Sequence, residues 1–310
     1  MPKKFEWYYF DLHSEDGYDL VFTLHSRPFM TQFAVAIFDI FLYKDNALLE
    51  HRFFTLPAKD LREEKPEALL WFNDNNFIAH KQNVIKAIAA KDDIRLDMEL
   101  IPVAGNPGAF RYDLLGAGHE KRKFIWRLFA PRCMARVKLS LGDKIYELQG
   151  QGYHDYNGGD VFLKKALKGW RWSKIYVEDK LFIIGEIMPR NASVHKILVV
   201  PDKNNLQHSA DFYFSERAGK LILKSHIAGL DILIEKKFQI DNIRFLTLQP
   251  ATLLQYPAMV YEILTAVSLQ YGLLKPLSRL LTNARYVRRR LLGKSVEGVE
   301  VQVFQEEIFF

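Results

Sequence analysis

The hydrophobic pattern of the chain predicts strands over most of its length. Four early segments are rich in Phe, Tyr, Val and Ile and are separated by turn-forming residues: 5–12, 18–27, 33–43 and 47–56. Residues 94–103 alternate between apolar and polar side chains, as expected of a strand with one buried face. Many short strands at regular spacing favour a mostly β protein built as a sandwich or a barrel.

A second series of strands follows the midpoint of the chain. Residues 135–153 predict a hairpin that turns at Gly142 and Asp143, and residues 170–189 predict another hairpin around Glu178 and Asp179. Strand-like segments continue to about residue 240 and return after residue 298. We therefore expect two strand-rich domains, residues 1–160 and 161–310.

Residues 251–292 break this pattern with apolar side chains at helical spacing. Seven of them recur mainly at intervals of three and four: Leu253, Tyr256, Val260, Ile263, Leu264, Val267 and Tyr271. We therefore expect a helical insertion over residues 251–292 in the second domain. One interpretation is a helical cap packed on a barrel, with its polar face in solvent.

The same region holds most of the net charge of +6, because residues 250–294 contain seven basic residues and one acidic residue, Glu262. The second interpretation of the insertion is therefore a helix at a membrane surface, with arginines bound to lipid phosphates. The candidate membrane contacts are Arg285, Arg288, Arg289 and Arg290. One short basic cluster without a recognisable binding fold does not support a nucleic-acid partner.

A polar, glycine-rich segment, GQGYHDYNGGD, occupies residues 150–160. In the simplest interpretation it is a strand that leaves the first domain, with glycines that permit bulges or positive φ and with Asp155 and Asn157 as turn formers. In a regular strand, His154 would share a face with Leu148, whereas Tyr153 and Asp155 would point to the other face. A bulge at the glycines would change which of His154 and Asp155 points inward.

Three motifs in order give this segment a family resemblance: Glu6–Asp11 (EWYYFD), Gly150–Gly159 (GQGYHDYNGG) and Trp170–Trp172 (WRW). They resemble the signature G-x-G-Y-x-D-H-N-W-G and its companion motifs in the carotenoid 1,2-hydratase and AttH-like family, across roughly residues 5–190. The resemblance implies two tandem lipocalin-like antiparallel β-barrels. It also implies hydration, cyclisation or isomerisation of a hydrophobic isoprenoid or polyene substrate. The chain departs from the signature at Tyr156 and Gly158, where the family usually has His and Trp.

The activity implied by the resemblance would require proton transfer to the substrate. A carboxyl group in an apolar cavity can stay protonated near neutral pH and can then protonate an alkene. Asp155 is the candidate acid, and His154 and Asn157 are candidates to orient it or a water molecule. Aromatic faces stabilise a carbocation, although core packing is the alternative role for each tryptophan. The candidate substrate-binding residues are Glu6, Trp7, Tyr153, Tyr156, Trp170 and Trp172.

Other features narrow the class of protein. The nine histidines form no close pair, and the chain has neither a G-x-G-x-x-G nor a P-loop pattern, so we expect no metal and no cofactor. A single cysteine, Cys133, excludes an intrachain disulfide, and no secretory signal or long apolar run is present. We expect a cytoplasmic protein, with peripheral contact at the inner membrane face in the membrane interpretation. A lipid or pigment carrier and a partner-binding scaffold are the non-catalytic alternatives.

Overall fold

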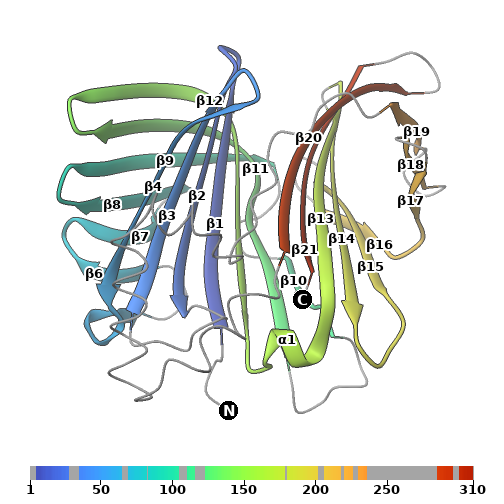
Figure 1. Cartoon of the computed structure of the whole chain (residues 1–310), viewed down its shortest axis with the longest axis horizontal. Coiled ribbons are helices and arrows are strands. Elements are labelled where there is room, and N and C mark those ends of the chain that lie inside the picture. The colour runs from blue at the N-terminus through green and yellow to red at the C-terminus, as the bar shows by residue number, and fades with distance from the viewer. Residues whose placement is uncertain are drawn as a thin grey trace. The chain divides into compact units, whose positions relative to one another are not determined.

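The computed structural model describes residues 5–27, 35–64, 69–81, 83–104, 110–115, 123–178, 180–201, 206–217, 220–225, 230–235, 285–295 and 300–309. These residues form antiparallel strands almost throughout (Figure 1). The helices among them are short: η1 (Ala58–Asp60) and α1 (Leu163–Ala166). The chain divides into two compact units: among the described residues, the first holds 5–113 and 123–161, and the second holds Leu114, Leu115 and the residues from Phe162 onward. The predicted domains, 1–160 and 161–310, stay a prediction.

The first unit is a 12-stranded sheet with the order β4-β3-β2-β1-β12-β11-β9-β8-β7-β6-β5, and β10 pairs with β11. Its strands are β1 (Phe5–Ser14), β2 (Tyr18–Arg27), β3 (Val35–Lys44), β4 (Ala47–Pro57), β5 (Arg62–Glu64), β6 (Leu69–Asn73), β7 (Asn76–Lys81), β8 (Val84–Lys91), β9 (Ile94–Ala104), β10 (Phe110–Asp113), β11 (Phe124–Leu141) and β12 (Lys144–Gly159). The strands β1 and β12, which are farthest apart along the chain, pair at the centre of this order.

One face of this sheet carries a continuous apolar cluster, called here the core face. Phe38 stacks on Phe54 at 4.6 Å and also meets Phe72 of β6 at 5.4 Å between ring centroids. Because β3 and β6 are far apart in the strand order, the sheet curls around its own core. The described residues show no ladder between β4 and β5, so the closed barrel that the resemblance implies stays a prediction.

The second unit is a nine-stranded sheet with the order β16-β15-β14-β13-β21-β20-β19-β18-β17. Its strands are β13 (Leu167–Val177), β14 (Lys180–Pro189), β15 (His195–Pro201), β16 (Leu206–Ser209), β17 (Tyr213–Arg217), β18 (Lys220–Ser225), β19 (Leu230–Glu235), β20 (Arg285–Ser295) and β21 (Glu300–Phe309). Its core includes Ile175, Phe182, Ile184, Leu198, Phe212, Phe214, Val301 and Val303.

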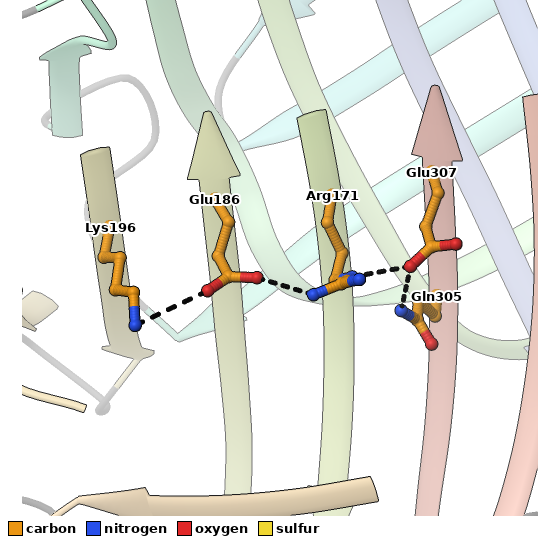
Figure 2. Close-up of polar contacts among 5 residues, drawn as sticks. All are labelled: Arg171, Glu186, Lys196, Gln305 and Glu307. Atoms are coloured by element: carbon orange, nitrogen blue, oxygen red, sulfur yellow. Dashed lines mark hydrogen bonds and ion pairs between the residues drawn. The ribbon is translucent and has the colours of Figure 1, made fainter. Parts of the chain in front are cut away.

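A chain of charged side chains lies across four neighbouring strands of the second unit (Figure 2). Arg171 donates from Nε to Glu307 Oε1 at 2.6 Å and from Nη1 to Glu186 Oε2 at 2.8 Å. Lys196 Nζ lies 3.7 Å from Glu186 Oε1, and Gln305 Nε2 donates to Glu307 Oε1 at 2.9 Å. Basic and acidic side chains thus alternate from Lys196 to Glu307 in one charge-balanced network, with Glu186 shared by both bases.

Most sequence-predicted strands are confirmed, and so are both predicted hairpins. β11 ends at Leu141 and β12 begins at Lys144, with Gly142 between them at φ 57°, in the left-handed region that favours glycine. In the second hairpin, Val177 of β13 pairs with Lys180 of β14. The sequence located these turns because turn-forming residues interrupt otherwise continuous strand patterns.

The predicted helical insertion needs a correction at its C-terminal end. Residues 251–284 lie outside the described residues, but Arg285–Ser295 is strand β20, which pairs with β21 along its length and with β19 near its end. The register places Arg288 opposite Glu306, and Arg288 Nε donates to Glu306 Oε1 at 2.9 Å. The residues at helical spacing, 253–271, lie outside the described residues, so the helical insertion before residue 285 stays a prediction.

Arg288 is only 2% exposed, so its assignment as a membrane contact is wrong. A membrane role for Arg285, Arg289 and Arg290 stays a prediction. Among the described segments, no helix is both long enough and apolar enough to cross a membrane.

Candidate functional site

The pairing of β1 with β12 positions most of the predicted site residues. The ladder runs without a shift from Phe5 opposite Gly159 to Ser14 opposite Gly150. Side chains therefore alternate between the two faces, and the regular-strand prediction is confirmed. The core face receives Glu6, His154 and Tyr156. The opposite face, called here the Asp155 face, receives Trp7, Tyr153, Asp155 and Asn157.

The glycines of this segment allow close backbone approach. A Cβ atom on Gly150 would lie 2.0 Å from the carbonyl oxygen of His13, and one on Gly159 would lie 2.1 Å from the carbonyl oxygen of Lys123. Neither glycine has a positive φ, and the β1–β12 ladder has no bulge. These two glycines therefore need neither a positive φ nor a bulge toward β1, and they fit β12 closely against its neighbours. The register shifts beside this segment lie on its other side, in β11 between Leu128 and Cys133.

Replacing Gly150 by alanine is expected to destabilise the protein by about 2 kcal/mol, because the new methyl group meets backbone that cannot move without opening the β1–β12 ladder. Urea unfolding measures the change. Gln151→Ala, at the exposed neighbouring position, is the matched control and is expected to stay within about 0.5 kcal/mol of the unchanged protein. Equal stability of the two variants would contradict the packing argument.

On the Asp155 face, three donors surround one buried carboxyl group. Oδ2 of Asp155 accepts hydrogen bonds from Trp126 Nε1 at 2.7 Å and from the Tyr153 hydroxyl at 2.6 Å. Oδ1 accepts a hydrogen bond from Asn157 Nδ2 at 3.0 Å. Asp155 is 4% exposed, so these bonds replace most of its contact with water. The three residues form what is called here the Asp155 cluster, with Asp155 at its centre.

Burial raises the pKa of the Tyr153 phenol, and the negative charge of Asp155 raises it further. The phenol therefore stays protonated and donates to the carboxylate. The surroundings are aromatic: the Tyr153 ring lies 6.0 Å from Tyr9, and Trp7 lies 6.0 Å from Phe124. The arrangement places a hydrogen-bonded acid–base pair among rings suited to an apolar partner.

On the core face, Glu6 lies at the centre of a second polar group. The Tyr156 hydroxyl donates to Glu6 Oε1 at 2.9 Å, and the Ser26 hydroxyl donates to Oε2 at 2.6 Å. His154 lies on the same face and donates from Nδ1 to the carbonyl oxygen of Tyr9 at 2.8 Å. Because the sheet separates His154 from Asp155, the structure does not support the predicted role of His154 in orienting that carboxyl group.

The remaining predicted site residues lie in the second unit. Trp170 and Trp172 are on β13, and Trp172 makes an edge-to-face contact with Phe304 at 6.1 Å. Their role in substrate binding stays a prediction. The described residues contain no group of three or more His, Cys, Asp or Glu placed to hold a metal ion.

Sequence reasoning missed Trp126 and Ser26, which complete the two groups. Trp126 precedes Asp155 by 29 residues, and the β11–β12 register brings it opposite Asn157. Ser26 reaches Glu6 through the pairing of β1 with β2. The sequence placed Ser26 in a predicted strand, 18–27, and placed Trp126 in the strand-rich first domain, but it gave no further signal for either residue.

Residues 65–213 match the family model described as carotenoid hydratase CrtC. Comparison with curated proteins gives no match.

Solved structures share the fold over almost the whole chain. An AttH-like protein from Nitrosomonas europaea matches with a TM-score of 0.54 and 11% identity, over 98% of this chain and 92% of its own. CghA in complex with Sch210972 matches with a TM-score of 0.64 and 10% identity, over 99% of this chain and 88% of its own. Kievitone hydratase from Nectria haematococca matches with a TM-score of 0.54 and 10% identity, over 99% of this chain and 89% of its own. The predicted resemblance to the carotenoid hydratase and AttH-like family is thus confirmed, by the family match over residues 65–213 and by a fold shared with AttH-like and hydratase structures.

Proposed function

We propose that this protein is an enzyme that transfers protons to and from a carbon–carbon double bond of a hydrophobic isoprenoid or polyene substrate, in a hydration, cyclisation or isomerisation. The observation that carries the proposal is the Asp155 cluster, a buried carboxyl group bonded to a protonated phenol and an indole among aromatic rings. The match to the carotenoid hydratase family supports the same class of substrate.

The Asp155–Tyr153 pair supplies the proton chemistry. Their oxygen atoms are 2.6 Å apart, a distance at which a proton can be shared between them. In a hydration, the pair delivers a proton to one alkene carbon, and water attacks the other carbon. The attacking water then loses a proton to the carboxylate, so the pair is restored and the net change is addition of one water molecule.

The other members of the site position the carboxyl group and stabilise the carbocation. Trp126 and Asn157 bind one carboxylate oxygen each, which fixes the carboxyl plane relative to β12. The rings of Trp7 and Phe124 lie on the same side of the sheet and offer aromatic faces to a developing carbocation. The polar groups needed for the reaction are all side chains of this chain, so we propose that the reaction needs no cofactor.

The test is incubation of the purified protein with an acyclic carotenoid whose terminal isoprenoid double bond is intact, in D₂O without added metal or nucleotide. Liquid chromatography with mass spectrometry separates the outcomes. A product heavier by one water, with deuterium on carbon, supports hydration. A product of unchanged composition with deuterium on carbon supports isomerisation or cyclisation. Saturable binding of the carotenoid with no product would overturn the enzyme proposal in favour of a carrier.

A further inference from the structure

The core face of the first unit holds polar groups that the proposed reaction does not use. Glu6 is fully buried, yet it lies on the same face as Phe10 and Leu12. Two hydroxyl groups, those of Tyr156 and Ser26, donate to its two oxygens, and Arg27 Nε lies 4.0 Å from Oε2. An acid in such a position costs free energy that an apolar residue would not, which suggests a function beyond packing.

Two buried or partly buried histidines of the first unit, His154 and His80, each have an Nε2 atom without a hydrogen-bond partner among the described residues. His154 is fully buried and uses Nδ1 to donate to the Tyr9 carbonyl, so Nε2 of the neutral ring is an acceptor. Nε2 of His154 has no partner among the described residues, and neither has Nε2 of His80. The two rings are 5.4 Å apart and nearly perpendicular. A buried imidazole with an unsatisfied acceptor is suited to receive a hydrogen bond from a ligand.

The electrostatic environment keeps both rings neutral. Burial lowers the pKa of His154 well below its ordinary value, and the neighbouring His80 lowers it further. Burial also lowers the pKa of His80, to about 4. Near neutral pH both rings are therefore uncharged, which does not favour an anionic ligand, and the acceptor offered is Nε2 of His154.

Gly158 allows Tyr156 to reach Glu6. A Cβ atom on Gly158 would lie 2.2 Å from the Tyr156 hydroxyl oxygen, so any larger residue would displace the phenol. The Tyr156 ring meets Tyr8 at 5.1 Å and Phe129 at 6.4 Å, and burial followed by the charge of Glu6 raises the pKa of its phenol. The two departures from the family signature are thus coupled, because glycine at 158 makes room for tyrosine at 156.

We propose that this core-face group, consisting of Glu6, Tyr156, His154 and His80, is a second ligand site that takes a neutral apolar molecule with a hydroxyl group. The hydroxyl would donate to His154 Nε2, and the apolar body would pack on Phe10 and Phe129, whose rings lie 3.8 Å and 5.2 Å from the His154 ring. Tyr156, Arg127 and His80 are only partly buried and mark the approach from solvent. The site is separate from the Asp155 cluster, on the other face of β12.

The test uses isothermal titration with farnesol and with its methyl ether, which keeps the apolar chain but cannot donate a hydrogen bond. The unchanged protein is expected to bind farnesol about tenfold more tightly than the ether. His154→Phe keeps an aromatic ring against Phe10 and is expected to remove this preference. Asp155→Asn, on the other face, is the matched control and is expected to retain it. Equal affinity for the two probes, no saturable binding, or a preference that survives His154→Phe would overturn the proposal.

A second readout does not depend on any variant. In protein labelled with ¹⁵N-histidine, farnesol is expected to shift the Nε2 resonance of His154 toward the value of a hydrogen-bonded acceptor, whereas the methyl ether is not. An unchanged resonance at saturating farnesol would overturn the assignment of His154 as the acceptor. Loss of carotenoid turnover in Asp155→Asn with intact farnesol binding would separate this site from the proposed active site.

Discussion

Asparagine in place of Asp155 is expected to lower the rate of turnover by about 10²–10⁴-fold, because an amide cannot carry the transferred proton. The fold should tolerate the change. The amide oxygen can still accept from Trp126 and Tyr153, the two donors to Oδ2. Its nitrogen then faces Asn157, whose own amide can turn to present an oxygen. We therefore expect a loss of activity without a large loss of stability.

Two variants make this expectation specific. Tyr153→Phe removes the phenol but keeps the ring, and it should also lower the turnover number because the carboxylate loses its proton-sharing partner. Asp39→Asn is the matched control, since Asp39 is another buried carboxyl group, 2.7 Å from His51 Nε2 and outside the cluster. Turnover number, KM and melting temperature should be measured for all three. Full activity in Asp155→Asn would exclude acid–base catalysis by this residue.

The candidate site was only partly predictable from the sequence. The signature motif indicated Asp155 and Tyr153, and strand alternation correctly placed His154 on the other face. Alternation also separates Glu6 from its neighbour Trp7, although the sequence analysis grouped both as substrate contacts. A motif groups residues by order along the chain, whereas a strand sends adjacent side chains to opposite sides of the sheet.

The fold was predictable where the pattern is local. Runs rich in Phe, Tyr, Val and Ile between turn residues located β1 to β4. Alternation located β9, because a strand with one buried face leaves a period of two in the sequence. β20 was not predictable in this way, because Arg288 is a cation at a fully buried position. What stabilises it there is Glu306 on the neighbouring strand, a contact that depends on sheet order and not on local pattern.

The charged network of the second unit carries the largest expected change in stability. Replacing Arg171 by methionine is expected to lower the free energy of unfolding of this unit by about 3–5 kcal/mol, because Glu186 and Glu307 lose their shared partner while remaining buried. Burial lowers the pKa of Arg171, but Glu307 and then Glu186 raise it more, so the guanidinium keeps its charge. Urea unfolding, combined with hydrogen exchange of β13 and β21 amides, measures the change in this unit.

Lys138→Met is the matched control, because Lys138 pairs with Glu147 at 3.0 Å but both side chains are exposed, and the pair should contribute less than about 1 kcal/mol.

A double-mutant cycle then separates burial of charge from lost packing. If the unpaired acids cause the loss, Glu307→Gln should cost less in the Arg171→Met background than in the unchanged protein, since the amide removes a charge that no longer has its partner. Strictly additive losses would mean that Arg171 stabilises the unit through its contact with Phe214, 5.0 Å from the guanidinium carbon to the ring centroid, and not through the two carboxylates.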